Sequence, residues 1–157
     1  RMPDPISPAR VYLVIMDETE EARSALRFAA RRAVRTGGAV HILALVQRQE
    51  FVAFGGVQAT IEEEARDRAE VLAMTAAGSL ASESGLTAVI AVKQGDGPQV
   101  VRAYLDEHPE VSALVLGAAN GNPGPLVTHF AGIAGQLSCP LMIVPGTMAD
   151  EDIDRLS

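Results

Sequence analysis

The sequence has few of the residues on which several common classes of protein depend. Its 157 residues include one cysteine, one lysine and no tryptophan, and aromatic residues make up 4% of the chain. A single cysteine excludes an internal disulfide framework and fits a reducing cytoplasm. No apolar run reaches the length of a membrane span, and no basic-then-apolar secretory leader is present. These features predict a cytoplasmic domain without a membrane anchor.

The charge balance is acidic, with a net charge of −7, which argues against nucleic acid as a partner because phosphate binding needs concentrated positive charge. Five arginines nevertheless gather in one helical segment, where we expect a solvated helix face: Arg23, Arg27, Arg31, Arg32 and Arg35. Residues 1–10 are proline-rich and expected to be loose, with Arg1 an expression remnant ahead of Met2. An acidic tail, residues 147–157, is expected to fray from Asp150 onward.

Sequence motifs for common catalytic and metal sites are missing. There is no P-loop, no G-x-G-x-x-G fingerprint and no G-x-S-x-G elbow. The three histidines show no metal-ligand spacing, so we expect structural or surface roles for His41, His108 and His129. Cys139 precedes a proline at the start of a strand and is expected to be a buried, inert thiol. An acidic receiver pocket would need a lysine after the fifth strand, but the only lysine is Lys93.

Strand and helix patterns alternate along the chain. Short apolar runs predict strands over residues 11–16, 40–46, 87–92, 111–116 and 141–144. Helical periodicity predicts four helices. The first ends near Thr36, the second spans about residues 59–84, the third runs from Gly97-Pro98 to Pro109, and the fourth spans residues 126–137. Asp17 and Glu20 have capping-box spacing at the first helix, with Thr19 as a rival N-cap. The alternation predicts a single α/β domain, a three-layer α/β/α sandwich around a five-stranded parallel sheet.

The connection between the second strand and the long helix contains an apolar segment, residues 51–56 (Phe-Val-Ala-Phe-Gly-Gly). Two interpretations remain open: a lid or partner surface formed by Phe51 and Phe54, or a loop tucked against the sheet edge, which we slightly favour.

Residues 111–126 form the most informative stretch, because a buried strand enters a loop rich in glycine and proline that leads into a helix. An α/β fold presents backbone N–H groups to an anion in this way. With Asp17 after the first strand, Gly95-Asp-Gly-Pro98 before the third helix and Cys139-Pro140 before the last strand, the chain resembles the universal stress protein family over residues 11–146. The resemblance implies a sheet order of 3-2-1-4-5, which brings Asp17 and the loop 117–125 to one crevice.

In that family the loop pattern G-x-x-G-x9-G-(S/T) holds the phosphates and ribose of ATP. Here only Gly117 is clearly kept, because Asn120 replaces the second glycine. Counting forward places Phe130-Ala131 at the final pair, whereas counting back from Cys139-Pro140 places Val127-Thr128 there and keeps a hydroxyl. Gly121 and Gly124 could compensate for the lost glycines, but Pro123 and Pro125 have no N–H to donate. The resemblance also assigns nucleotide contact to Asp17 and adenine recognition to the backbone near Leu45.

The resemblance implies a non-catalytic, stress-linked regulatory protein. Its candidate ligand-binding residues are Asp17, Leu45, Gly117, Asn120, Gly121, Gly124 and Thr128. The eroded motif predicts either no cofactor or weak binding of ATP or AMP, with or without magnesium. The alternative is an ATP- or AMP-binding protein that is a slow ATPase or a nucleotide-dependent switch. The strand at 141–144 is apolar and uncharged and falls at a sheet edge, which predicts a homodimer joined along this strand. A regulatory role also implies a protein partner, whose identity is unknown. No nucleic-acid or membrane partner is expected.

Overall fold

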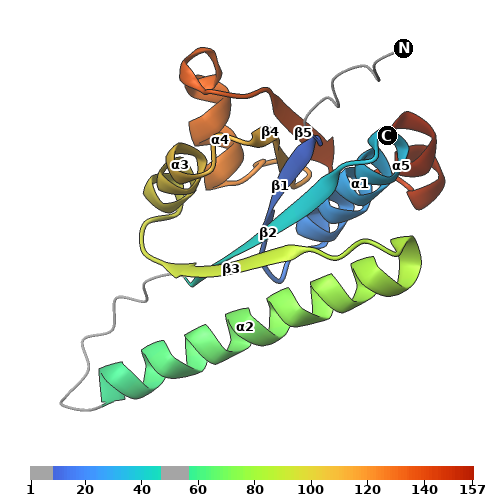
Figure 1. Cartoon of the computed structure of the whole chain (residues 1–157). Helices are drawn as coiled ribbons and strands as arrows, with labels where there is room; N and C mark the ends of the chain where they lie inside the picture. Colours follow the sequence, from blue (N-terminus) through green and yellow to red (C-terminus); the bar gives the residue numbers. More distant parts are fainter. Residues whose placement is uncertain (1–8, 47–56) are drawn as a thin grey trace, which may run out of the picture.

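The structure is a computed structural model, and it describes residues 9–46 and 57–157. Within these residues five strands alternate with the helices (Figure 1). The strands are β1 (Val11–Met16), β2 (Ala39–Val46), β3 (Val89–Gln94), β4 (Val111–Ala118) and β5 (Leu141–Pro145). The helices are α1 (Glu20–Thr36), α2 (Val57–Ser84), α3 (Gly97–Glu107), α4 (Pro125–Gly132) and α5 (Asp150–Leu156), with a 3-10 turn at Ala134–Gln136. The apolar segment at 51–56 lies outside the described residues.

All neighbouring strands are parallel, and their order across the sheet is β3-β2-β1-β4-β5. The α/β class that the sequence predicts and the strand order that the resemblance implies are therefore both confirmed. The chain winds in one direction from β1 to β2 and β3, and in the other direction to β4 and β5. The carboxyl ends of β1 and β4 meet where the winding reverses, which is where open parallel sheets bind ligands.

The sheet separates two apolar cores, because alternate residues of each strand point to opposite faces. Tyr12, Val14 and Met16 of β1 pack on the face that α1 and α2 cover. Leu13 and Ile15 pack on the other face, against α3 and α4. In α1 the residues that meet the sheet are small and buried, so the helix axis can approach the strands closely: Ala22, Ala25, Ala29 and Ala33.

Local side-chain chemistry fixes both ends of α1. Thr19 is the N-cap, and its hydroxyl accepts a hydrogen bond from the Ala22 N–H at 3.3 Å. The capping box that begins at Asp17 is therefore wrong, and the rival N-cap is correct. At the other end Gly37 adopts a left-handed conformation with φ 66°, and Gly38 N–H donates to the Ala33 carbonyl at 2.8 Å. The glycine pair stops the helix as predicted.

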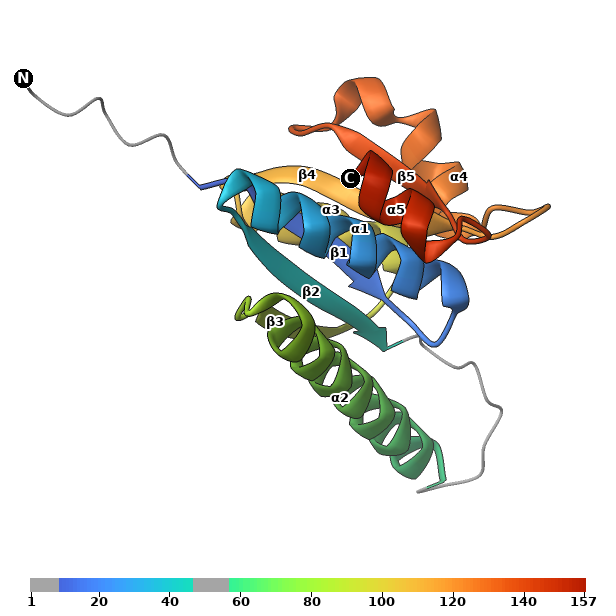
Figure 2. The same ribbon diagram turned by 90° about the vertical axis from the view of Figure 1, so that its right-hand side faces the viewer.

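The C-terminal residues form a helix, so the prediction of a fraying acidic tail is wrong. Ile153 of α5 is fully buried, and α5 lies alongside α1 (Figure 2). Arg27 binds Asp154 through two hydrogen bonds, Nε at 2.9 Å and a terminal nitrogen at 2.8 Å, and Arg31 binds the same carboxylate at 3.1 and 2.9 Å. Arg35 donates to the carbonyls of Asp154 and Ser157. These three arginines are contacts for α5, so the prediction of a purely solvated face is wrong for them.

Several element boundaries also differ from the predicted ones by one or more residues. The third strand begins at Val89 rather than at residue 87, because its register is set by pairing with His41–Val46 of β2. The fourth strand extends to Ala118. The predicted helix over 126–137 starts at Pro125 and ends at Gly132, and a 3-10 turn replaces its last part. The apolar periodicity of the sequence continues past the end of α4 at Gly132, so the pattern did not reveal where this helix ends.

Candidate ligand-binding crevice

A crevice of about 860 Å³ lies at the carboxyl ends of three neighbouring strands. Met16 of β1, Val46 of β2 and Leu116 of β4 contribute to its lining, together with the segments that follow these strands. The volume falls within the range of roughly 300–1,000 Å³ that small-molecule sites occupy. The topology of the sheet thus forms a cavity where the reversed winding leads us to expect one.

Four of the seven predicted ligand-binding residues line this crevice, namely Asp17, Leu45, Gly117 and Gly124. Asn120, Gly121 and Thr128 do not line it, and their side chains or backbones are exposed. The loop after β4 closes on itself through a bond from Ala119 N–H to the Pro123 carbonyl at 3.4 Å. That closure places Asn120 and Gly121 at the outer tip, away from the crevice. Ligand contact by any of the seven residues stays a prediction.

Asp17 is held by the turn that precedes α1. Its Oδ1 accepts a hydrogen bond from Thr19 N–H at 2.9 Å and a second, short one from the Thr19 hydroxyl. Because Thr19 also caps α1, the carboxylate of Asp17 is positioned by the same residue that starts the helix. The turn sets the carboxylate at the mouth of the crevice, where its side chain is exposed.

Gly117 has a packing role that the family resemblance did not suggest. A Cβ added to Gly117 would overlap the backbone carbonyl of Glu21, in the first turn of α1. Gly146 approaches the same residue, since its Cβ would lie 2.7 Å from the Glu21 Cβ. Both glycines let the start of α1 sit directly on the ends of β4 and β5. This close approach accounts for glycine at position 117 whether or not a ligand binds there.

The loop between β4 and α4 offers few backbone donors. Pro123 and Pro125 have no N–H, and the Gly124 N–H donates to the Asn122 side chain at 3.2 Å. Thr128 N–H donates to the Gly124 carbonyl at 3.1 Å, within the first turn of α4. Among the lining residues of this loop, Leu126 and Val127 have N–H groups without a partner earlier in the helix. Gly124 adopts a φ of 104° in this turn, and a Cβ added to it would meet no protein atom within 4 Å.

Sequence reasoning did not find most of the charged lining. Four carboxylates line the crevice, those of Asp17, Glu18, Glu21 and Asp96. Asp96 is the N-cap of α3, and its side chain accepts a hydrogen bond from Gln99 N–H at 3.2 Å. Among the described lining residues one cation, Arg68 of α2, accompanies them. The sequence did contain a hint for Arg68, because this residue directly precedes Ala69, which belongs to the apolar stripe of α2 that faces the sheet.

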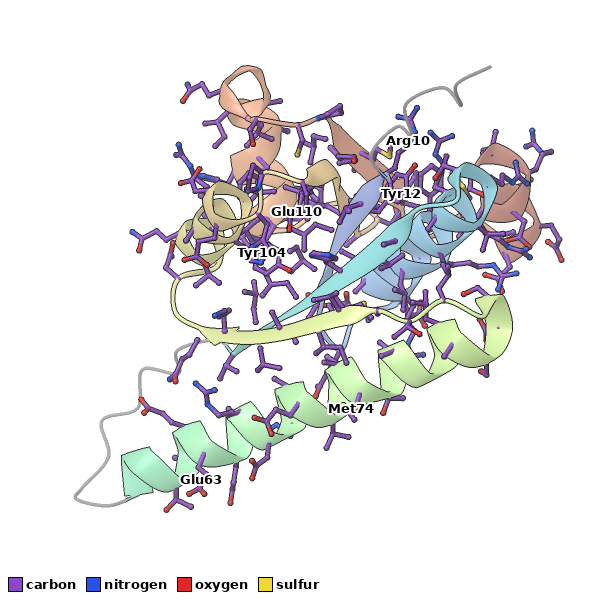
Figure 3. The ribbon with its side chains drawn as sticks, in the orientation of Figure 1. Arg10, Tyr12, Glu63, Met74, Tyr104 and Glu110 are labelled. Carbon is purple, nitrogen blue, oxygen red and sulfur yellow. The ribbon has the colours of Figure 1, made fainter. Side chains whose placement is uncertain are left out.

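The described histidines and the cysteine lie outside the crevice lining. His41 is buried, and its Nδ1 lies 2.7 Å from the Tyr104 hydroxyl, while burial lowers the pKa of His41. His108 stacks on the Tyr104 ring at 3.9 Å between ring centroids, and Figure 3 shows Tyr104 on α3 near Glu110. Burial raises the pKa of the Cys139 thiol, which favours the unreactive protonated form. Residues 9–46 and 57–157 contain no group of three candidate metal ligands and no helix with the length and apolarity of a membrane span.

The chain was compared with protein families, curated proteins and solved structures, and it resembles one family in both sequence and fold. The family description "Universal stress protein family" matches residues 9–145, whereas no curated protein matches significantly. Universal stress protein UspA from Lactobacillus plantarum superposes with a TM-score of 0.73 at 15% identity, covering 88% of this chain and 99% of that one. A family protein from Arabidopsis thaliana with AMP bound gives 0.58 at 17% identity, covering 90% and 94%. A universal stress protein in complex with cAMP gives 0.60 at 15% identity, covering 88% and 98%.

Proposed function

Because this chain belongs to the universal stress protein family, we propose that it is a non-catalytic regulatory protein that acts as a homodimer and binds ATP weakly or not at all. The observation that carries the ATP part is the small number of donors in the loop after β4. Two prolines and one side-chain-bonded amide leave the N–H groups of Leu126 and Val127 for an anion. A triphosphate usually needs many such donors, with cations or a metal ion, to replace its hydration.

The lining also supports a non-catalytic role. Its described residues contain carboxylates, one guanidinium and the Thr19 hydroxyl, but no lysine, histidine or cysteine. The hydroxyl of Thr19 donates to Asp17 while its oxygen caps α1, so this pair serves the fold of the turn. A hydrolase would need a positioned nucleophile and base with donors for the developing charge. Regulation through protein contacts needs none of these groups.

The dimer is proposed from the edge strand β5. Ile143 is 42% exposed, although it is an aliphatic residue in the middle of a strand. An exposed edge presents unpaired N–H and C=O groups that a second copy can satisfy by antiparallel pairing about a two-fold axis. Pro145 ends the strand, and because it cannot donate a hydrogen bond it would also limit the length of pairing.

A second candidate function is that of a nucleotide-dependent switch that binds AMP-like ligands. It is favoured by the ligands of two structural relatives, AMP and cAMP, each of which has one phosphate. A single phosphate places a smaller demand on the two free N–H groups than a triphosphate does. The two candidates therefore differ in whether the crevice is empty or occupied by a small ligand during regulation.

The experiment that tests the proposal is titration of ATP with magnesium by calorimetry, combined with a phosphate-release assay. We expect no binding in the micromolar range or below and no measurable turnover. A sub-micromolar dissociation constant that Asp17→Ala abolishes would overturn the ATP part. Magnesium-dependent release faster than about 1 per second, within the ordinary range of enzymes, would overturn the non-catalytic part, provided that Asp17→Asn reduces it and thus excludes a contaminant.

A further inference from the structure

The crevice extends across the strand ends from one face of the sheet to the other. Ile15 and Leu45 line it on the face covered by α3 and α4, and Gly97 and Leu126 continue that wall. The next residues along the strands, Met16 and Val46, point to the opposite face. There the lining continues along α2 through Ala65, Ala69 and Leu72. The cavity thus has a second wall on α2, separate from the loop between β4 and α4.

Arg68 of α2 belongs to this second wall. It lines the crevice and also a neighbouring hollow of about 390 Å³, which shares Glu18 and Leu72 with the crevice. Within the described part of the chain the Arg68 guanidinium has no hydrogen bond or ion pair, even with Glu18 on the same two hollows. Its side chain is exposed. A guanidinium at a cavity mouth without a protein partner has its donors available to an anion.

The charges around Arg68 restrict which anion can bind. Asp17, Glu18, Glu21 and Asp96 line the same crevice, so the described lining contains four carboxylates and one cation. A polyphosphate would place several negative charges among these carboxylates. Asp17, Glu18 and Asp96 are exposed, so the repulsion should be strongest at low ionic strength and weaken as salt screens it. One guanidinium matches one phosphate group through two parallel hydrogen bonds. The balance of charge therefore favours a ligand with a single phosphate over one with three.

We propose that Arg68 is the specificity-determining residue of the crevice, contacting the phosphate of a singly phosphorylated nucleoside against α2 and leaving polyphosphates excluded by the surrounding carboxylates. The proposal rests on the second candidate function, in which a small ligand occupies the crevice, and it names the ligand class and the residue that contacts the phosphate. It places the anion beside α2, where the guanidinium lies, rather than over the donor-poor start of α4. The base then has the apolar wall of Ile15, Leu45 and Leu126 to contact.

The test is calorimetric titration of adenosine, AMP, cAMP and ATP into the full chain and into two variants. Arg68→Gln removes the charge, and Arg66→Gln is the matched control, because Arg66 is exposed on the same helix and lines neither hollow. We expect AMP or cAMP to bind at least tenfold more tightly than ATP. A charged hydrogen bond is worth about 1.5–3 kcal/mol, so Arg68→Gln should weaken the monophosphate by roughly 10- to 150-fold. Adenosine binding should not change in either variant.

Each other outcome would contradict the assignment. ATP binding as tightly as AMP, equal AMP affinity in wild type and Arg68→Gln, or no binding of any of the four compounds would overturn it. If none of the four compounds binds, the Arg68 proposal fails, but the proposed regulatory dimer with an empty crevice still stands. If the protein turns over ATP, only the proposed non-catalytic role fails. The failure of one proposal can therefore be distinguished from the failure of the other. Glu18→Gln gives an independent check, since removal of one carboxylate should raise ATP affinity. An unchanged melting temperature for Arg68→Gln ensures that lost binding is not lost folding.

Discussion

Arg27 and Arg68 lie on two helices that cover the same face of the sheet, yet their surroundings differ completely. Arg27 shares Asp154 with Arg31, and the distances from the two guanidinium groups to the carboxylate are 2.8 and 2.9 Å. Arg68 lines a cavity and has no such partner among the described residues. At the contact between α1 and α5 the fold satisfies its own charges. At the crevice it leaves one cation, Arg68, without a partner among the described residues.

The comparison separates groups that maintain the structure from groups that can bind a partner. Charged groups with partners inside the chain act on stability, and their removal should change unfolding. Groups without internal partners add little to stability, so at a concave site they can bind an external ligand without loss of folding free energy. The exposed edge of β5 belongs to the second kind, because β5 pairs with β4 on one side only and no described strand pairs with its outer side.

The largest expected effect concerns that edge. Ile143→Lys places a charge on β5 and should convert a dimer into a monomer, as measured by light scattering across micromolar concentrations. The matched control is Val89→Lys, since Val89 is 50% exposed on β3, the edge at the opposite side of the sheet. A wild-type monomer, or a dimer that both substitutions leave unchanged, would show that β5 is not the interface.

Gly117→Ala should cause the next largest effect, because the new Cβ overlaps the Glu21 carbonyl and forces α1 away from β4. Overpacking of this kind costs about 1–3 kcal/mol of unfolding free energy. Gly132→Ala is the control, since its Cβ would meet nothing within 4 Å. Thermal or urea unfolding measures both variants. Equal melting temperatures would mean that Gly117 belongs to the ligand site alone.

Asp154→Asn should lower the melting temperature, because α5 loses the carboxylate that joins it to Arg27 and Arg31. The two arginines lower the pKa of Asp154 from 3.8 to about 2. A depressed folded-state pKa means that the contribution is complete above about pH 4 and is lost as the pH falls toward 2. The difference between wild type and variant should therefore shrink over that range. Asp152→Asn is the control, since Asp152 pairs only with Arg155, three residues along α5.

Arg68→Gln should have the smallest effect on stability, within about 0.5 kcal/mol, as is usual for exposed positions without special contacts. The two variants test the comparison directly when their unfolding is measured in the same buffer. Asp154→Asn should lose more stability than Arg68→Gln. A large loss of stability from Arg68→Gln would mean that the guanidinium maintains the fold and is not held for a ligand.

The sequence predicted the fold well because the relevant signals are local. Apolar runs such as Val11–Met16, the glycine stop at Gly37 and the Ala22–Ala33 stripe each report on a few neighbouring residues. The C-terminal helix α5 was missed because it has one buried apolar residue, Ile153, and its partners on α1 lie more than 100 residues away. No window of the sequence contains both sides of that contact.

The crevice was predicted in part for the same reason. Asp17 and Leu45 end strands whose meeting point follows from topology, so they could be placed. Asn120 was assigned by counting along a motif, and Gly121 was assigned as a loop glycine that could compensate for the lost ones. Neither lines the crevice, because the loop closes through the contact between Ala119 and Pro123. Arg68 was missed because a cation next to an apolar stripe has the same pattern whether it faces solvent or a cavity.

The two tyrosines give the molecule a built-in pair of spectroscopic reporters. Tyr12 belongs to the core under α1 and α2, and Tyr104 to the core under α3 and α4, with each side chain at most 3% exposed. Because the chain contains no tryptophan, tyrosine emission is not masked by energy transfer to an indole. Tyr12→Phe and Tyr104→Phe would each leave one emitter, on one side of the sheet. Unfolding curves from the two variants can then reveal whether both layers melt together or one after the other.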